Sequence, residues 1–242
     1  MRPTLVMFKR ALATVTVALP SLCVACGSTP GAQPHDMSAA QHEAMATGES
    51  RTAAAHAAQF SPDASVEVDR CLGRGGCWTS TKNPTAEHLE EAKKHQKMAA
   101  DHRAASQALR EAEARACVGL SDADRDESPF DHREDIASVA PLTEGVGAGK
   151  FQYTRTAGAI ITFRALPGMT AQWLQRVIDC HIARNAALGH DVPEMSYCPL
   201  VPNNVTARVD PTASGFAVAV RSDDSDTADE VLRRARALVA AR

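Results

Sequence analysis

The sequence predicts an α+β fold: a long Ala-rich antiparallel helical hairpin followed by a small β-α-β-β-α domain. Two observations lead to this prediction. Two long stretches in the first half are rich in alanine, the strongest helix former, and carry few helix-breaking residues. In the second half, short segments rich in Ile, Val, Thr and Phe alternate with segments whose apolar residues recur at helical spacing.

The first helix is expected from Ser38 to about Gln59. Ser38 and Gln41 have the spacing of a capping box, in which each side chain accepts a hydrogen bond from the backbone N–H of the other residue. Residues 60–83 contain three glycines, one proline and two cysteines, and we interpret them as a loop.

The second helix is expected to begin after Asn83 and to continue to Gly119. Asn83 can cap its N-terminus, and Pro84 fits the first helical position. The helix then spans about 35 residues, or roughly 50 Å at 1.5 Å per residue. Two long alanine-rich helices in succession suggest an antiparallel hairpin.

The second half is expected to form the small α+β domain. An acidic segment, 121–135, and a Gly-rich connection, 145–149, come first. The expected elements are a strand at Ala159–Leu166, a helix at Thr170–Leu188, strands at Val205–Asp210 and Gly215–Arg221, and a helix at Asp226–Ala241. The pattern leaves open a further strand near 136–140 or 150–155.

The N-terminal segment has the features of a secretory signal: basic residues, an apolar run from Ala11 to Leu22, and the small residue Ala25 before Cys26. A cysteine at this place resembles the signal of bacterial lipoproteins, in which it receives lipid and becomes the new N-terminus. The resemblance implies that Cys26 is lipidated and anchors the chain in a membrane. Because Gly27 rather than Asp follows, it also implies an outer-membrane location, facing the periplasm or the cell surface. Cleavage without lipid and retention as an uncleaved anchor are the alternatives.

The predicted organisation has four parts: a signal peptide at 1–25, a polar tether at 26–37, the helical hairpin with its cysteine-containing loop at 38–120, and the α+β domain at 121–242. Removal of residues 1–25 takes away three basic residues and no acidic ones, so the net charge changes from −3 to −6. Nucleic-acid binding normally requires a concentrated basic patch, so a nucleic acid is not an expected partner.

The cysteines that follow residue 26 are expected to be structural. They are Cys71, Cys77, Cys117, Cys180 and Cys198. Their spacing is irregular and shows no paired C-x-x-C motifs, which argues against zinc and favours disulfides. We predict a Cys71–Cys77 bond, which closes a Gly-rich ring, and a Cys180–Cys198 bond. Cys117 is then unpaired, because it lies at the end of the second helix, roughly 50 Å from Cys77.

Histidines form the most unusual pattern in the chain. Residues spaced by seven share a helix face, and each predicted helix has one such series: His42, Glu49 and His56, then His88, His95 and His102. The second series neighbours columns of alanine, which places it in the apolar seam between the helices. In a register where paired residue numbers sum to about 144, three layers are expected: His42 with His102, Glu49 with His95, and His56 with His88.

These six residues are also candidate metal ligands. Histidines seven apart on one helix lie about 10.5 Å apart along its axis, so an ion would need ligands from both helices, or a pair three or four apart such as Glu91 with His95 or Met98 with His102. Facing imidazole and carboxylate groups favour zinc or nickel, and Met–His pairs favour copper. A second interpretation is purely structural: the small alanines leave room for imidazoles whose partners are the facing Glu and the backbone. A third interpretation is a proton-sensitive seam, because imidazoles titrate near neutrality.

The segments that resemble motifs of catalytic or cofactor sites do not match those motifs. The acidic run 122–127 lacks the Gly and the final Glu of an EF-hand loop, and segment 145–150 lacks the Ser or Thr of a phosphate loop. Five consecutive charged residues, 131–135, are interpreted as a salt-bridged turn. We therefore predict a non-catalytic, envelope-anchored lipoprotein without a cofactor, an interaction or accessory module whose partners are the membrane and an envelope protein. The alternative is a periplasmic metal-binding protein that uses the six histidine-series residues and Cu, Zn or Ni.

Overall fold

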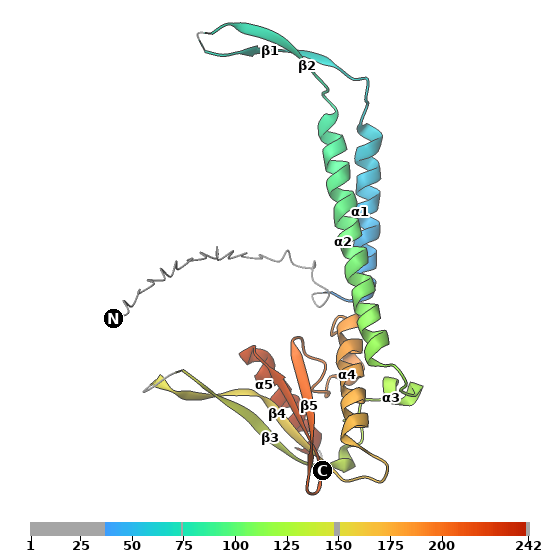
Figure 1. The fold of residues 1–242 in the computed structure, drawn as a ribbon, viewed down its shortest axis with the longest axis vertical. Coiled ribbons are helices and arrows are strands. Elements are labelled where there is room, and N and C mark those ends of the chain that lie inside the picture. Colours follow the sequence, from blue (N-terminus) through green and yellow to red (C-terminus); the bar gives the residue numbers. More distant parts are fainter. Residues whose placement is uncertain (1–36, 74, 148–150, 241–242) are drawn as a thin grey trace, which may run out of the picture.

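The structure is a computed structural model that describes residues 37–73, 75–147 and 151–240 (Figure 1). The predicted signal peptide, the lipidation site Cys26 and most of the predicted tether lie outside these residues. The described chain combines helices with antiparallel sheets, so the α+β class is confirmed. In chain order the helices and strands are α1 (Ala39–Gln59), β1 (Val66–Cys71), β2 (Cys77–Lys82), α2 (Ala86–Ala116), α3 (Asp122–Asp126), η1 (Arg133–Asp135), β3 (Ile136–Val146), β4 (Tyr153–Arg164), α4 (Ala171–Ala187), η3 (Pro193–Met195), β5 (Val205–Thr212), β6 (Gly215–Ser222) and α5 (Ser225–Ala240).

Helix α1 begins where the capping box predicts it. Ser38 Oγ accepts a hydrogen bond from Gln41 N at 3.1 Å, and Gln41 Oε1 accepts one from Ser38 N at 2.8 Å. Helix α2 begins at Ala86, and Asn83 is not its N-cap. Instead, Asn83 Oδ1 accepts a hydrogen bond from Thr85 N at 2.7 Å, and its amide group donates to the connection that follows α1. The side chain of Asn83 therefore holds the approach to the helix rather than the helix end.

Residues 60–83, interpreted as a loop from the sequence, contain the two-stranded antiparallel ribbon β1–β2. Its register runs from Val66 opposite Lys82 to Cys71 opposite Cys77, where the predicted Cys71–Cys77 disulfide closes it. The ribbon lies at the end of α1 and α2 that is remote from the second sheet (Figure 1). The loop prediction was wrong because nearly every residue of these short strands is exposed, so no buried face marks them.

The second half forms a four-stranded antiparallel sheet with strand order β3-β4-β6-β5. Its chain order is β-β-α-β-β-α rather than β-α-β-β-α, because β3 is an additional strand and β4 starts at Tyr153 instead of Ala159. Both positions considered for a further strand are used. Residues 136–140 belong to β3, and part of 150–155 forms the start of β4.

Helices α4 and α5 pack against one face of this sheet. Side chains alternate between the two faces of a strand, and those on the helix side are buried, as for Ile161 of β4 opposite Val218 of β6. Leu174 of α4 and Leu238 of α5 pack into the same core. Ile160, on the other face of β4, is only half-buried. The hydrophobic core of the domain therefore lies between the sheet and the two helices.

The helix pair α1–α2 is fixed to the α+β domain at its base. Ala39 and Leu109 form a small buried cluster with Ala187 of α4. Gly189 follows α4 with φ +72°, and a Cβ at this position would lie 2.7 Å from Ser38 N. Glycine therefore allows the start of α1 to approach the end of α4 this closely.

The second disulfide joins Cys117 to Cys180, so the predicted Cys180–Cys198 bond is wrong and Cys117 is not unpaired. Helix α4 packs along the C-terminal end of α2, which brings the two Cα atoms within 4.7 Å. Cys198 is instead fully buried in the domain core, 3.4 Å from Ser128 Oγ. The prediction was wrong because only the distance from Cys117 to Cys77 was considered. The packing of α4 against α2, which brings Cys180 to Cys117, does not follow from that distance.

The disulfides also carry information on location. Two such bonds are present, and bonds of this kind form and persist in oxidising compartments. They indicate a location outside the cytoplasm. Within the described residues, no helix combines the length and the apolar character needed to cross a membrane.

Candidate functional site

The candidate site is the line of contact between α1 and α2, which we call the His seam: His42, Glu49 and His56 of α1 with His88, His95 and His102 of α2. The three pairs expected from the sequence are present in the structure. The paired atoms are His42 Nδ1 and His102 Nδ1 at 2.9 Å, Glu49 Oε2 and His95 Nδ1 at 2.5 Å, and His56 Nδ1 and His88 Nδ1 at 3.4 Å. Polar side chains thus meet across the two helices at three levels.

Small side chains let the two helices come close enough for these contacts. Four alanines of the interface are almost completely buried: Ala46 and Ala53 on α1 and Ala92 and Ala99 on α2. Their residue numbers place Ala46 level with Ala99, and Ala53 level with Ala92, in the register of the histidine pairs. A layer of alanine therefore separates each polar layer from the next.

The layer nearest the α+β domain consists of His42 and His102, which we call the inner pair. His42 is fully buried, and the two ring centroids lie 5.2 Å apart with the rings tilted by 46°. The 2.9 Å separation of the Nδ1 atoms is that of a hydrogen bond in which one ring donates and the other accepts. The inner pair thus satisfies its facing nitrogens within the seam.

The other two layers form one continuous group, which we call the outer cluster: Glu49, His56, His88 and His95. The His56 ring lies near the rings of both α2 histidines in this cluster, with centroids 5.7 Å from His88 and 5.5 Å from His95. The rings of His56 and His95 are nearly parallel, at 8°. The side chains of His95 and Glu49 keep 20% and 14% of their exposure. The outer cluster is therefore shielded by the helices without being sealed from solvent.

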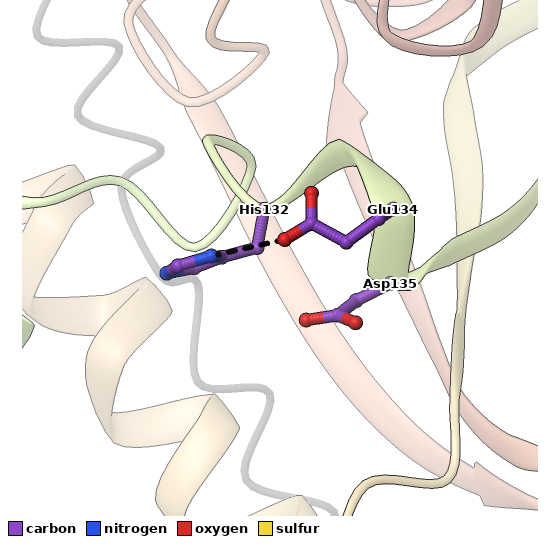
Figure 2. Close-up of side chains that lie close together, drawn as sticks. All are labelled: His132, Glu134 and Asp135. Atoms are coloured by element: carbon purple, nitrogen blue, oxygen red, sulfur yellow. Dashed lines mark ion pairs between the residues drawn. The ribbon is translucent and has the colours of Figure 1, made fainter. Parts of the chain in front are cut away.

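A second group of ligand-type side chains lies just before β3. Figure 2 shows His132, Glu134 and Asp135, each of which offers one ligand atom within 4.8 Å of the others. In the part of the chain that the structure describes, no other three residues of this kind come as close, and the His seam offers its ligands in pairs. His132 Nδ1 lies 3.5 Å from Glu134 Oε1, and these side chains are 61% and 73% exposed. An ion pair this exposed contributes little to stability or to geometry.

Cys180 and His181 are neighbours in sequence but do not form a catalytic pair, because Cys180 is bonded to Cys117. His181 is fully buried, and its Nε2 lies 3.2 Å from Asp124 O. Desolvation by burial lowers the pKa of His181 below its ordinary value. Its Nδ1 has no hydrogen-bond partner among the described residues. Sequence reasoning did not single out His181 as a buried residue, although its place among the apolar residues of α4 was the available signal.

The His seam is the arrangement with the clearest chemical content, because it brings six ligand-type side chains into contact at three levels of an interface that also contains layers of buried alanine. What it does has to be inferred from these contacts. Comparison of the chain with protein-family models, with curated proteins and with solved structures finds no match.

Proposed function

We propose that the protein is a non-catalytic lipoprotein of the bacterial envelope that acts as an interaction or accessory module. Lipid on Cys26 anchors it in the outer membrane. Residues 38–120 work as one antiparallel helical hairpin that presents the β1–β2 ribbon to an envelope protein. The observation that carries the proposal is the exposed apolar surface of this ribbon, far from the α+β domain (Figure 1).

One face of the ribbon combines apolar and basic side chains. Side chains alternate between the two faces of a strand, and residues directly opposite each other lie on the same face. The register therefore groups Val66, Val68 and Arg70 of β1 with Trp78, Ser80 and Lys82 of β2. Trp78 is 48% exposed, and Leu72, at the closed end, is 67% exposed. The opposite face is polar, and Thr79 Oγ1 there donates a hydrogen bond to Asp69 Oδ1 at 2.9 Å.

The ribbon lacks a packing partner of its own. Among the described elements, β1 and β2 pack extensively on each other and on no further helix or strand to a comparable extent. A two-stranded ribbon by itself is marginally stable in water, so the Cys71–Cys77 disulfide helps to keep its end closed. Exposed apolar patches are typical of interaction sites. A partner that covers Trp78 and Leu72 would supply the buried surface that the ribbon lacks.

The helix pair holds the ribbon at a distance from the domain. Helix α2 has 31 residues, which corresponds to about 46 Å. Its C-terminal end is attached to α4 by the Cys117–Cys180 disulfide and by the ion pair between Arg184 Nη1 and Glu113 Oε1 at 3.3 Å. Because the base is fixed, the ribbon has a defined direction as well as reach. This is the property that a module contacting a distant partner requires.

A photocrosslinking experiment in the native-like bacterial envelope tests the contact. A photoreactive amino acid is placed at Trp78, and in a matched control at Thr79, the next residue on the opposite face. We expect position 78 to give an adduct with one envelope protein and position 79 to give none. Absence of an adduct at position 78, or the same adducts from both positions, would overturn the proposed role of the ribbon face.

Mass spectrometry of the same protein tests the anchor. We expect an N-terminal peptide that begins at Cys26 and carries a diacylglycerol group. An unmodified N-terminus at another residue would show that the protein is not anchored by lipid, whether or not the ribbon contact exists.

A further inference from the structure

We propose that the outer cluster binds one divalent transition-metal ion, zinc or nickel. His56 and His88 are the first two ligands, His95 is the third, and Glu49 positions His95. The site uses residues of α1 and α2 and none of the exposed ribbon face, so this inference is independent of the contact proposed above.

His56 and His88 already form one edge of such a site. Their Nδ1 atoms come from opposite helices and lie 3.4 Å apart. Two ligand atoms of a tetrahedral zinc site with bonds of 2.0–2.1 Å lie about 3.3 Å apart. The same two atoms of the inner pair lie 2.9 Å apart, the distance of a good hydrogen bond. The distance between the Nδ1 atoms of His56 and His88 therefore suits two ligands of one ion, whereas the distance within the inner pair suits a hydrogen bond.

His95 is held in the manner of a metal-binding histidine. Its Nδ1 is 2.5 Å from Glu49 Oε2, so in the neutral imidazole Nδ1–H donates a hydrogen bond to the carboxylate and Nε2 keeps its lone pair. Carboxylate–histidine pairs of this kind orient metal ligands in many proteins and raise their basicity. An imidazole-rich set with a carboxylate partner suits zinc and nickel.

One movement completes the site. The described residues of the outer cluster do not bring three ligand atoms within 4.8 Å of one another. The ring of His95 already stacks on that of His56, with centroids 5.5 Å apart, and its side chain is 20% exposed. The proposed site therefore includes a rotation of the His95 side chain, followed by Glu49, that brings His95 Nε2 to the edge formed by His56 and His88, with water as the fourth ligand.

The two other candidate groups are less suitable. The facing nitrogens of the inner pair bond to each other, and among the described residues no third ligand-type side chain joins them within 4.8 Å. The group of His132, Glu134 and Asp135 is formed by one short segment (Figure 2), and the side chains of His132 and Glu134 are 61% and 73% exposed. Both groups therefore provide matched controls for the outer cluster.

The test is calorimetric titration of the full purified chain with ZnCl₂ and with NiCl₂, after removal of metals by a chelator. We expect one ion per chain for at least one of the two metals. The variants His56→Gln, His88→Gln and His95→Gln should each raise Kd by at least about tenfold, because loss of even a hydrogen-bonding partner of a metal ligand weakens binding by about that factor. The control variants His102→Gln and His132→Gln should leave Kd unchanged.

A second readout does not depend on the heat of binding. An ion that binds only the folded state raises Tm, so the metal should raise Tm of the wild-type chain and of His102→Gln but not of His88→Gln. Circular dichroism checks that each variant is folded, and only the folded outer variants are compared with the wild-type chain. Failure of the wild-type chain to bind either metal, equal losses in His102→Gln, or loss confined to His132→Gln would each overturn the proposal.

Discussion

Cys117 and Cys180 are joined by a disulfide that ties the C-terminal end of α2 to α4, with Cα atoms 4.7 Å apart. One turn away on each helix, Arg184 and Glu113 form an ion pair. Together these contacts make the base of the helix pair part of the α+β domain, so the direction of α1 and α2 depends on a covalent bond.

The double variant Cys117→Ala/Cys180→Ala should unfold more easily than the wild-type chain. The bond closes a loop with a sequence separation of 63, and a bond of this kind stabilises a protein by about 2 to 4 kcal/mol, chiefly by restricting the unfolded chain. Urea denaturation followed by circular dichroism measures the loss. The control is Cys71→Ala/Cys77→Ala, where the separation is 6 and the two strands pack mainly on each other. Equal losses in the two double variants would contradict this account of the base.

Cys198 should resist alkylation in the folded protein. The thiol is fully buried, and this burial raises its pKa above the ordinary value. Alkylation requires an accessible thiolate, and Cys198 in the folded protein is neither accessible nor readily ionised. Mass spectrometry after treatment with iodoacetamide should find the Cys198 peptide unmodified before denaturation and modified after it, with Cys117 linked to Cys180 throughout. Rapid labelling of Cys198 in the native protein would show that the core around it opens.

Contacts within the helix pair could be predicted from the sequence because they depend on helix geometry alone. Residues seven apart stay on one face, so the spacing of His42, Glu49 and His56 and the alanines between them define both the face and the register. The capping box at Ser38 is equally local, and it marks the start of α1 correctly.

Contacts that depend on tertiary packing could not be predicted in this way. The partner of Cys180 is decided by where α4 lies beside α2, and no periodicity in either helix encodes that. The ribbon β1–β2 and the additional strand β3 lie at exposed edges, where strand residues need not follow a pattern of burial. The approach of the His56 ring to both His88 and His95 depends on side-chain rotation, which the spacing of residues in the sequence does not predict.

His181 should make the stability of the domain depend on pH. Burial lowers its folded-state pKa, whereas the unfolded chain binds a proton near the ordinary value of about 6.5. Below that pH the unfolded state binds more protons than the folded state, so the free energy of unfolding falls as pH decreases. Above it the histidine is neutral in both states and contributes no slope. Nearby Asp126 weakens the effect, because its carboxylate favours the charged imidazole.

The variant His181→Gln isolates this contribution, since Gln retains a donor for Asp124 O and does not titrate. Urea denaturation at a series of pH values gives the slope for both proteins. Other groups titrate equally in both, so the difference between the two slopes belongs to His181, with an upper limit of about 1.4 kcal/mol per pH unit. Parallel curves below pH 6.5 would mean that the folded protein protonates His181 as readily as the unfolded chain does.

Ala99→Leu should destabilise the helix pair because the seam has no room for a larger side chain. Ala99 is 1% exposed and lies level with Ala46, which is fully buried. Three additional carbon atoms at this point must push α1 away from α2, and overpacking of this kind costs about 1–3 kcal/mol. The free energy of unfolding, measured by urea denaturation, should fall by that amount.

Ala100→Leu provides the matched control, because Ala100 is the next residue of α2 and is exposed. The same substitution there changes helix propensity equally but meets no facing helix, so its effect should stay within about 0.5 kcal/mol. The contrast between adjacent positions separates packing across the seam from any intrinsic effect of leucine. If both variants retain the stability of the wild-type chain, α1 and α2 are not in close contact at this level. That result would also contradict the close contacts of the polar layers on either side of Ala99.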